Sequence, residues 1–195
     1  LDSQEIDNVK IVNQDILKFN LDEHLVPGEK YKIVANLPYN ISSVFLRLFL
    51  SSPRQPQSLT LMLQKEVVKR LPALPPDMSI LSVSVQYYGQ PYYVKDVPAA
   101  DFWPQPKVDS AVVKIDIDKR HRSFSEEKSF FHLVRCAFSS RRKMLKNNLA
   151  SGLKIKQEIV LEFLEKAGLP ATIRAEALSL DDWQKLFAAY SSFVL

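Results

Sequence analysis

The stretch YKIVANLPYN (residues 31–40) decides the fold, because in it a short apolar run passes directly into a polar turn. Residues 31–35 have the length and the β-branched content of a buried strand. In the turn, Pro38 disfavours helical backbone at Leu37 and holds that residue extended. We therefore expect the turn at the carboxyl end of a strand, which is where open α/β sheets place their ligands.

Outward from this turn, strand-like and helical patterns alternate. Residues 9–13 and 59–63 are further apolar runs of strand length, whereas residues 43–50 and 66–71 place apolar side chains at helical spacing. Such alternation indicates βαβ units on a mostly parallel sheet. Residues 80–85 alternate apolar residues with serine, which fits either a strand or a serine-rich helix.

Two more strands are expected at residues 92–97 and 111–117. The segment PAADFWPQPK between them leaves no room for a crossover helix, so we expect the two strands to be antiparallel neighbours. From residue 123 onward the pattern is helical only. The helix boundaries are marked by caps and breakers, namely Ser123 or Ser125, Gly168 with Pro170, and the capping box Ser179 with Asp182. The predicted fold class is thus α/β followed by a small all-helical domain, with a boundary near residues 119–123.

The charge distribution separates these two parts. Residues 1–118 hold 12 Lys and Arg against 14 Asp and Glu, whereas residues 119–195 hold 14 against 8. A basic helical region suits a polyanion, because neutralised phosphates release condensed counterions. The same charges also fit a solvated helical face.

Other classes of function find little support in the sequence. The single cysteine, Cys136, excludes an internal disulfide, and the three scattered histidines give no metal-ligand spacing. The apolar run at residues 44–50 is interrupted by Arg47 and is far shorter than the roughly 20 residues of a membrane span. We expect a cytoplasmic monomer without metal. Because the chain starts with Leu1, we also expect that this is not its native start.

The turn at residues 36–39 carries the chemistry. The Asn36 side chain and the Leu37 carbonyl are two acceptors directed to one place, which suits an exocyclic amino group such as adenine N6. Tyr39 offers a flat face on which a base can stack. The alternative is a plain strand-to-helix turn, for which Asn and Pro are common turn formers.

Six segments together resemble one family. They are NLPYN (36–40), QKEVVKRL (64–71), LSVSVQYY (81–88), FWPQPKVDSAVV (102–113), FSSRRKMLKNNL (138–149) and RAEALSLDDWQKLF (174–187). In this order they resemble the KsgA-type adenine dimethyltransferases of small-subunit ribosomal RNA. The resemblance implies a Rossmann-like class I methyltransferase domain at residues 1–120, missing its first strands, and an RNA-binding helical domain at residues 121–195.

The resemblance also implies an activity and a set of site residues. The cofactor would be S-adenosyl-L-methionine, and the substrate two adjacent adenosines in the 3′-terminal hairpin loop of small-subunit RNA in an immature 30S-type particle. Asn36, Leu37 and Pro38 would hold the adenine amino group. The rings of Tyr39 and Phe102 would lie on the two faces of the base. Asp15, the Ile16 N–H and Asn36 would contact the cofactor. The RNA backbone would be held by four basic residues, Arg141, Arg142, Lys143 and Lys146.

Two features depart from the family pattern. The glycine-rich cofactor loop should precede the strand before Asp15, but the four glycines form no GxGxxG arrangement. We therefore expect weak cofactor binding by this chain and an unpaired strand at residues 9–13. The segment PPDMSI (75–80) also replaces the Gly/Lys/Tyr/Gly pattern usual before LSV, which puts that loop's contacts in doubt.

Three alternatives remain from the sequence. A non-catalytic RNA-binding assembly factor, or a relative of mitochondrial transcription factors, could keep the fold without the reaction; the intact NLPY argues against it. The large-subunit enzyme of macrolide resistance usually has Ile at the second motif position. A DNA adenine methyltransferase is disfavoured by the basic helical domain.

Overall fold

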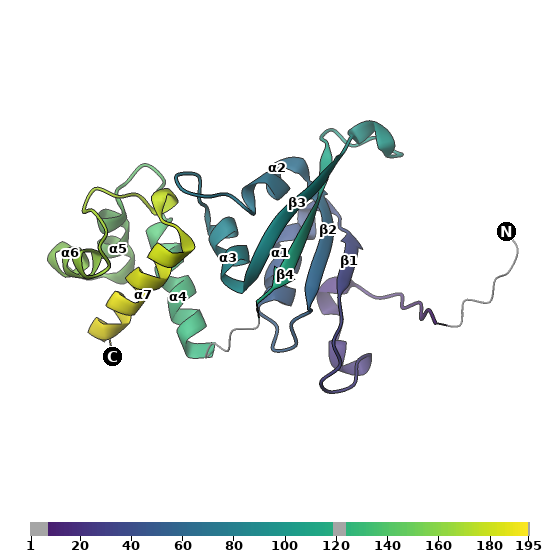
Figure 1. The fold of residues 1–195 in the computed structure, drawn as a ribbon, viewed down its shortest axis with the longest axis horizontal. Coiled ribbons are helices and arrows are strands. Elements are labelled where there is room, and N and C mark those ends of the chain that lie inside the picture. The colour runs from purple at the N-terminus through teal and green to yellow at the C-terminus, as the bar shows by residue number, and fades with distance from the viewer. Residues whose placement is uncertain (1–7, 119–123, 195) are drawn as a thin grey trace, which may run out of the picture.

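A four-stranded mixed sheet forms the centre of the first part of the chain (Figure 1). The computed structural model describes residues 8–118 and 124–194. The strands are β1 (Ile33–Asn36), β2 (Ser58–Gln64), β3 (Gly89–Val97) and β4 (Ser110–Ile117), in the order β1-β2-β4-β3. β1 and β2 are parallel, whereas β4 runs antiparallel to both of its neighbours. The antiparallel β3–β4 pair predicted from the short connection is confirmed.

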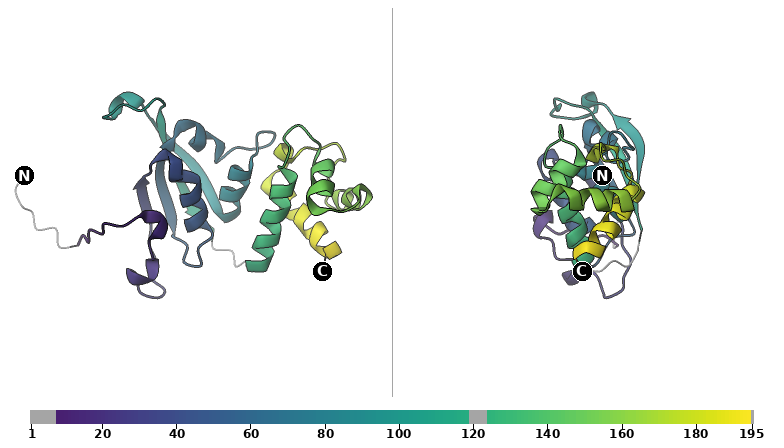
Figure 2. Two further views of the ribbon diagram at one scale, coloured as in Figure 1. Left: turned by 180° about the vertical axis from the view of Figure 1, so that it is seen from behind. Right: turned by 90° about the vertical axis from the view of Figure 1, so that its left-hand side faces the viewer.

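Helices α1 (Ser42–Leu50) and α3 (Ile80–Tyr88) lie beside one another on one face of the sheet (Figure 2). Phe45 and Leu46 of α1 and Val85 of α3 are buried in the same hydrophobic core cluster as Leu59, Leu61 and Leu63 of the central strand β2. The short α2 (Lys65–Arg70) follows β2 directly and contacts β4. The helices predicted at residues 43–50 and 66–71 are therefore confirmed.

The ambiguous segment at residues 80–85 is helical. Ser79 and Ser82 form a reciprocal capping box, in which the Ser82 N–H donates to the Ser79 hydroxyl (3.2 Å) and the Ser79 N–H to the Ser82 hydroxyl (2.6 Å). Ser84 then donates back to the Ile80 carbonyl within the helix. The alternating pattern alone does not distinguish a strand from a helix here. The serines favour the helix because their hydroxyls bond to nearby backbone groups.

The helical part consists of α4 (Phe124–Ala137), α5 (Leu145–Leu153), α6 (Gln157–Lys166) and α7 (Leu180–Val194). Stacked rings join it to the sheet part: Tyr87 of α3 lies 4.5 Å from Phe130 of α4, centroid to centroid. One hydrophobic core cluster runs through both parts of the molecule. Among the described residues no helix is long and apolar enough to cross a membrane.

The predicted helix boundaries are partly confirmed. Gly168, with a left-handed φ of +70°, follows α6, and the Ser179–Asp182 capping box opens α7. Ser125 lies inside α4 and does not cap it, whereas Ser123 and the predicted domain boundary lie outside the described residues.

The prediction of a strand at residues 9–13 is wrong. These residues have no strand structure, and the side chains of Val9 and Ile11 are 61% and 91% exposed. A strand needs a neighbour for its N–H and C=O groups, and β1 pairs only with β2 in the described sheet. The expectation that this segment would be left without a partner is confirmed.

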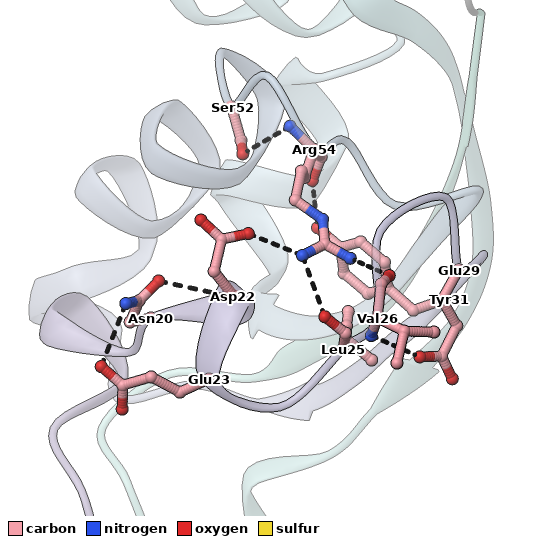
Figure 3. A network of polar contacts seen from close by, with 9 residues as sticks. All are labelled: Asn20, Asp22, Glu23, Leu25, Val26, Glu29, Tyr31, Ser52 and Arg54. Atoms are coloured by element: carbon pink, nitrogen blue, oxygen red, sulfur yellow. Dashed lines mark hydrogen bonds and ion pairs between the residues drawn. The ribbon is translucent and has the colours of Figure 1, made fainter.

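Polar contacts around Arg54 attach the N-terminal segment to the sheet (Figure 3). The Arg54 guanidinium donates to the Asp22 carboxylate (2.6 Å) and to the carbonyls of Leu25 (3.1 Å) and Val26 (2.6 Å). The Tyr31 hydroxyl donates to the Arg54 carbonyl, and burial raises the pKa of Tyr31. Since Tyr31 and Arg54 precede the parallel strands β1 and β2, this network fixes the ends of the strands opposite the candidate site.

Candidate active site

The turn at residues 36–39 lies at the carboxyl end of β1, as predicted. Asn36 is the last residue of β1 and pairs with Met62 of β2. The Leu37 N–H donates to the Met62 carbonyl (3.4 Å), and the Leu37 side chain is buried. Asn36 and Pro38 on either side are exposed. The buried leucine thus anchors a turn whose polar groups face solvent.

Tyr39 is held at its hydroxyl end by a residue far away in sequence. Its hydroxyl shares a hydrogen bond of 2.9 Å with the Ser110 hydroxyl. Ser110 is 1% exposed and begins β4, where it pairs with Gln64 of β2 and Val97 of β3. The bond therefore restrains the ring of Tyr39 beside the start of β4, one of the two central strands of the sheet. Sequence reasoning missed Ser110, because only the strand register brings it beside Tyr39.

Phe102 lies in the connection between β3 and β4. The two ends of this connection lie at the same end of the sheet as the NLPY turn. Phe102 follows the 3-10 turn η4 (Ala99–Asp101), and the Asp109 carboxylate accepts the Ala99 N–H (3.0 Å) across the base of this connection. Phe102 is half-buried, whereas Trp103 beside it is 98% exposed. No contact between the rings of Phe102 and Tyr39 is present among the described residues.

Charged side chains surround this edge. Lys65 forms an ion pair with Asp96 (3.1 Å), and Tyr93 donates a hydrogen bond to the same carboxylate. The bond from Tyr93 and the charge of Lys65 lower the pKa of Asp96, while the bond to Asp96 raises the pKa of Tyr93 to about 12. Lys69 lines a hollow of about 410 Å³ beside them. Lys65, Glu66 and Asp109 line the same hollow, so two cations and two carboxylates meet there.

Asp15 does not follow a strand, contrary to the sequence-based expectation. It caps η1 (Ile16–Lys18), and its carboxylate accepts the Leu17 N–H (3.0 Å). η1 packs against α1, the helix that follows the NLPY turn. Within the described ranges no hydrogen bond joins Asp15 or Ile16 to residues 36–39. The packing of η1 on α1 is thus the link between the Asp15 segment and the NLPY turn that the described residues show.

The basic turn, residues 140–143, links α4 to α5. Arg141, Arg142 and Lys143 are exposed, and Lys146 in the first turn of α5 is half-buried. Asn148, which is 3% exposed, shapes this turn by donating to the carbonyls of Ala137 (2.7 Å) and Ser140 (2.9 Å). Sequence reasoning missed Asn148, although a polar residue on the apolar face of a helix was the available signal.

The atypical segment at residues 75–80 has a structural role. Met78 is 4% exposed, and its N–H donates to the Glu176 carbonyl of the helical part (3.1 Å). The next residue, Ser79, caps α3. This loop therefore ties the two parts of the molecule together.

No group of three His, Cys, Asp or Glu side chains able to hold a metal occurs among the residues that the structure describes. Cys136 is buried, as predicted, and this burial raises the pKa of its thiol. His24 stacks on Phe19 at 4.6 Å between ring centroids. Cys136 and His24 thus have packing roles.

The chain matches a known family and named relatives. Residues 3–191 match the family model described as ribosomal RNA adenine dimethylase. The chain is 43% identical over 185 residues to ribosomal RNA small subunit methyltransferase A of Dehalococcoides mccartyi, and 39% identical over 183 residues to the protein of that name from Alkaliphilus oremlandii. These matches cover 94% and 90% of the chain, which spans 64% of the length of each relative.

Two solved structures share the fold. A dimethyladenosine transferase from Plasmodium falciparum superposes with a TM-score of 0.79 at 24% identity, covering 97% of this chain and 74% of that one. The 23S rRNA methyltransferase ErmE superposes with a TM-score of 0.71 at 22% identity, covering 94% and 72%. These likenesses confirm the predicted fold class, an α/β methyltransferase-like sheet followed by helices.

Proposed function

Because this chain belongs to the ribosomal RNA adenine dimethylase family, we propose that it is the larger part of an rRNA adenine N6,N6-dimethyltransferase. Its substrate is two adjacent adenosines in the 3′-terminal hairpin loop of small-subunit rRNA. The curated relatives are named as small-subunit rRNA methyltransferases. That name and the NLPY turn favour the small-subunit substrate over the large-subunit one.

One observation carries this proposal: at the carboxyl end of β1 the Tyr39 hydroxyl is bonded to Ser110, which ends the connection that holds Phe102 and begins β4. In the proposed site the Asn36 side chain and the Leu37 carbonyl accept the two N–H groups of adenine N6, with Pro38 keeping Leu37 extended. Tyr39 and Phe102 cover the two faces of the base. Such a base must leave its stack to enter, which suits a loop nucleotide.

The cofactor of the proposed reaction is S-adenosyl-L-methionine, which supplies an activated methyl group when bound. The residues present fit it only in part. The free oxygen of the Asp15 carboxylate, the Ile16 N–H and the Asn36 side chain are suitable partners, but no glycine-rich loop exists among the 195 residues. What the chain's own residues supply is the hold on the acceptor base and the electrostatic support of its amino nitrogen.

We place the boundary between the two domains at residue 120. The helical domain, residues 121–195, binds the RNA backbone through four basic residues: Arg141, Arg142, Lys143 and Lys146. The exposure of Arg141, Arg142 and Lys143, on a turn shaped by Asn148, supports this role. We further propose that the protein acts in the cytoplasm as a monomer on the immature small-subunit particle.

Mass spectrometry of digested RNA tests the proposed activity. The chain is incubated with a hairpin RNA of small-subunit sequence and S-adenosyl-L-methionine at increasing concentration. We expect N6,N6-dimethyladenosine to form at a rate that rises with cofactor concentration. Asn36→Ala should abolish the product.

The second candidate function is a non-catalytic rRNA-binding assembly factor, which would use the same exposed cations of the basic turn. Two hairpins, with adenosine or 2-aminopurine at the target position, distinguish the two. Both candidates predict RNA binding, but only the enzyme predicts N6-methylated product from the adenosine hairpin; the 2-aminopurine hairpin, which has no amino group at C6, reports only stacking of the base on Tyr39. Quenching without product at saturating cofactor would establish the binding protein for this chain.

A further inference from the structure

Trp103 is the most exposed large apolar side chain among the described residues, at 98%. The other tryptophan of the chain, Trp183, is fully buried in the helical part. A single exposed apolar residue is common on protein surfaces and by itself indicates no function. Trp103 differs in its position, because it directly follows Phe102 in the β3–β4 connection, which extends beyond the sheet in Figure 1.

The backbone that carries Trp103 is held by hydrogen bonds. The Phe102 N–H donates to the Ala99 carbonyl (3.3 Å), and the Ala99 N–H donates to the Asp109 carboxylate (3.0 Å) on the far side of the connection. Pro104 follows Trp103 and has a fixed φ. A restrained backbone thus presents the indole ring to solvent, so that little conformational freedom is lost when a ligand binds the ring.

The side chains of Phe102 and Trp103 point to opposite sides of the connection. Phe102 has extended backbone, with φ −113° and ψ 147°, and consecutive side chains of extended backbone alternate between two sides. Phe102 is accordingly half-buried, whereas Trp103 lies in solvent. In the proposed site Phe102 faces the target base, so Trp103 faces away from that base.

An RNA strand with one base turned out has a matching two-sided arrangement. The target base rotates by about 180° about its backbone to enter a pocket, so that the target base and the next base lie on opposite sides of the strand. The Cα atoms of consecutive residues are about 3.8 Å apart, close to the rise of about 3.4 Å between nucleotides of one strand. Two consecutive side chains can therefore contact two consecutive nucleotides.

The nucleotide beside a turned-out base has lost one stacking partner. An exposed indole ring is large and flat and can cover the face that has become free. Such stacking accepts any base, because every base has a π-face. A ring at this position therefore offsets part of the cost of unstacking the target base.

We propose that Trp103 stacks on the nucleotide adjacent to the target adenosine, in the place that the target base leaves. The inference rests on the proposed function, in which the substrate is two adjacent adenosines. It assigns a contact to the second adenosine while the first is bound at the NLPY turn.

Iodide quenching of tryptophan fluorescence tests the contact in the 195-residue chain. Iodide should reach only Trp103 in the folded protein, because Trp183 is 0% exposed. A saturating hairpin RNA of small-subunit sequence should abolish the fluorescence that iodide can quench. Fluorescence that stays accessible to iodide with the hairpin bound overturns the proposal.

Hairpins with 2-aminopurine at the neighbouring position locate the contact. Trp103→Ala should abolish the quenching at this position and weaken hairpin binding by about 5- to 150-fold, the loss of one base–aromatic stack. Trp103→Phe keeps a ring and should retain most of the quenching. Since Trp103 is exposed, both variants should keep the stability of the unchanged chain in urea.

Tyr92→Ala is the matched control. Tyr92 is also an exposed aromatic residue, but it lies on β3 five residues before the end of the strand at Val97. It is therefore roughly 17 Å from the connection along the strand. A loss of affinity in Trp103→Ala no larger than that in Tyr92→Ala counts against the proposal.

The outcome is separable from that of the proposed function. If Tyr39→Ala abolishes quenching at the target position while Trp103→Ala leaves the neighbouring position quenched, the Trp103 proposal fails and the base site stands. If the hairpin shields Trp103 from iodide while 2-aminopurine at the target position is not quenched, the contact of Trp103 with RNA stands and the proposed base site fails.

Discussion

Removing the hydrogen bond between Tyr39 and Ser110 tests whether the sheet holds the Tyr39 ring, the proposed stacking surface for a base, in place. The bond is 2.9 Å long and joins two hydroxyls 71 residues apart. A bond of this kind contributes about 0.5–1.5 kcal/mol net, whereas a buried hydroxyl left without a partner costs about 1–3 kcal/mol. Because Ser110 is 1% exposed and Tyr39 only half-buried, the two single variants should differ.

Tyr39→Phe leaves the buried Ser110 hydroxyl unpaired and should lower the free energy of unfolding by about 2 kcal/mol. Ser110→Ala leaves a phenol that water can reach and should cost about 1 kcal/mol. The double variant should cost less than the sum, with a coupling energy of about 1 kcal/mol in urea denaturation. Ser151→Ala, at an exposed position of α5, is the matched control.

A comparison of Tyr39→Phe with Tyr39→Ala shows whether RNA binding depends on the position of the Tyr39 ring or on the presence of the ring. Tyr39→Phe keeps the ring and should weaken binding of the 2-aminopurine hairpin by only about two- to tenfold. Tyr39→Ala removes the stack, worth about 1–3 kcal/mol, and should weaken it by about 5- to 150-fold. A coupling energy of zero, or equal losses in Tyr39→Phe and Tyr39→Ala, would refute the reasoning.

Four further outcomes are expected. Gly152→Ala should lower the free energy of unfolding by about 1–2 kcal/mol in urea, because the new Cβ would lie 2.6 Å from the Cys136 Cβ and the overpacking exceeds the helix-propensity gain. Asn148→Ala should lower the free energy of unfolding by about 1–3 kcal/mol and should weaken binding of a single-stranded RNA such as a uridine 12-mer, since it frees the basic turn. A loss of stability with unchanged RNA affinity would contradict the link between Asn148 and RNA binding. Reversing the charges of Arg141 and Arg142 should flatten the salt dependence of RNA binding, and an unchanged slope would exclude them from the interface. Native Cys136 should react with a disulfide reagent far more slowly than in urea, because burial raises its pKa; since the folded pKa is the higher one, stability should fall as the pH rises above about 9.

Local patterns predicted most elements of this fold. The strands at residues 59–63, 92–97 and 111–117, and the helices that end or begin at Gly168 and Ser179, follow from apolar spacing and from caps within a few residues. Residues 9–13 show the limit of such patterns. Their apolar run is typical of a strand, but a strand exists only where a neighbouring strand supplies hydrogen-bond partners.

The sequence by itself determined the candidate base site, because the chemistry of Asn36, the stiffness of Pro38 and the ring of Tyr39 are contiguous in the chain. Only the tertiary structure decided what holds and surrounds that site. Ser110 reaches Tyr39 through strand register, and Asn148 of α5 shapes the basic turn through bonds to Ala137 and Ser140. Ser110 lies 71 positions from Tyr39, and Asn148 lies 11 and 8 positions from its two partners. Such pairings arise from packing, which no local periodicity contains.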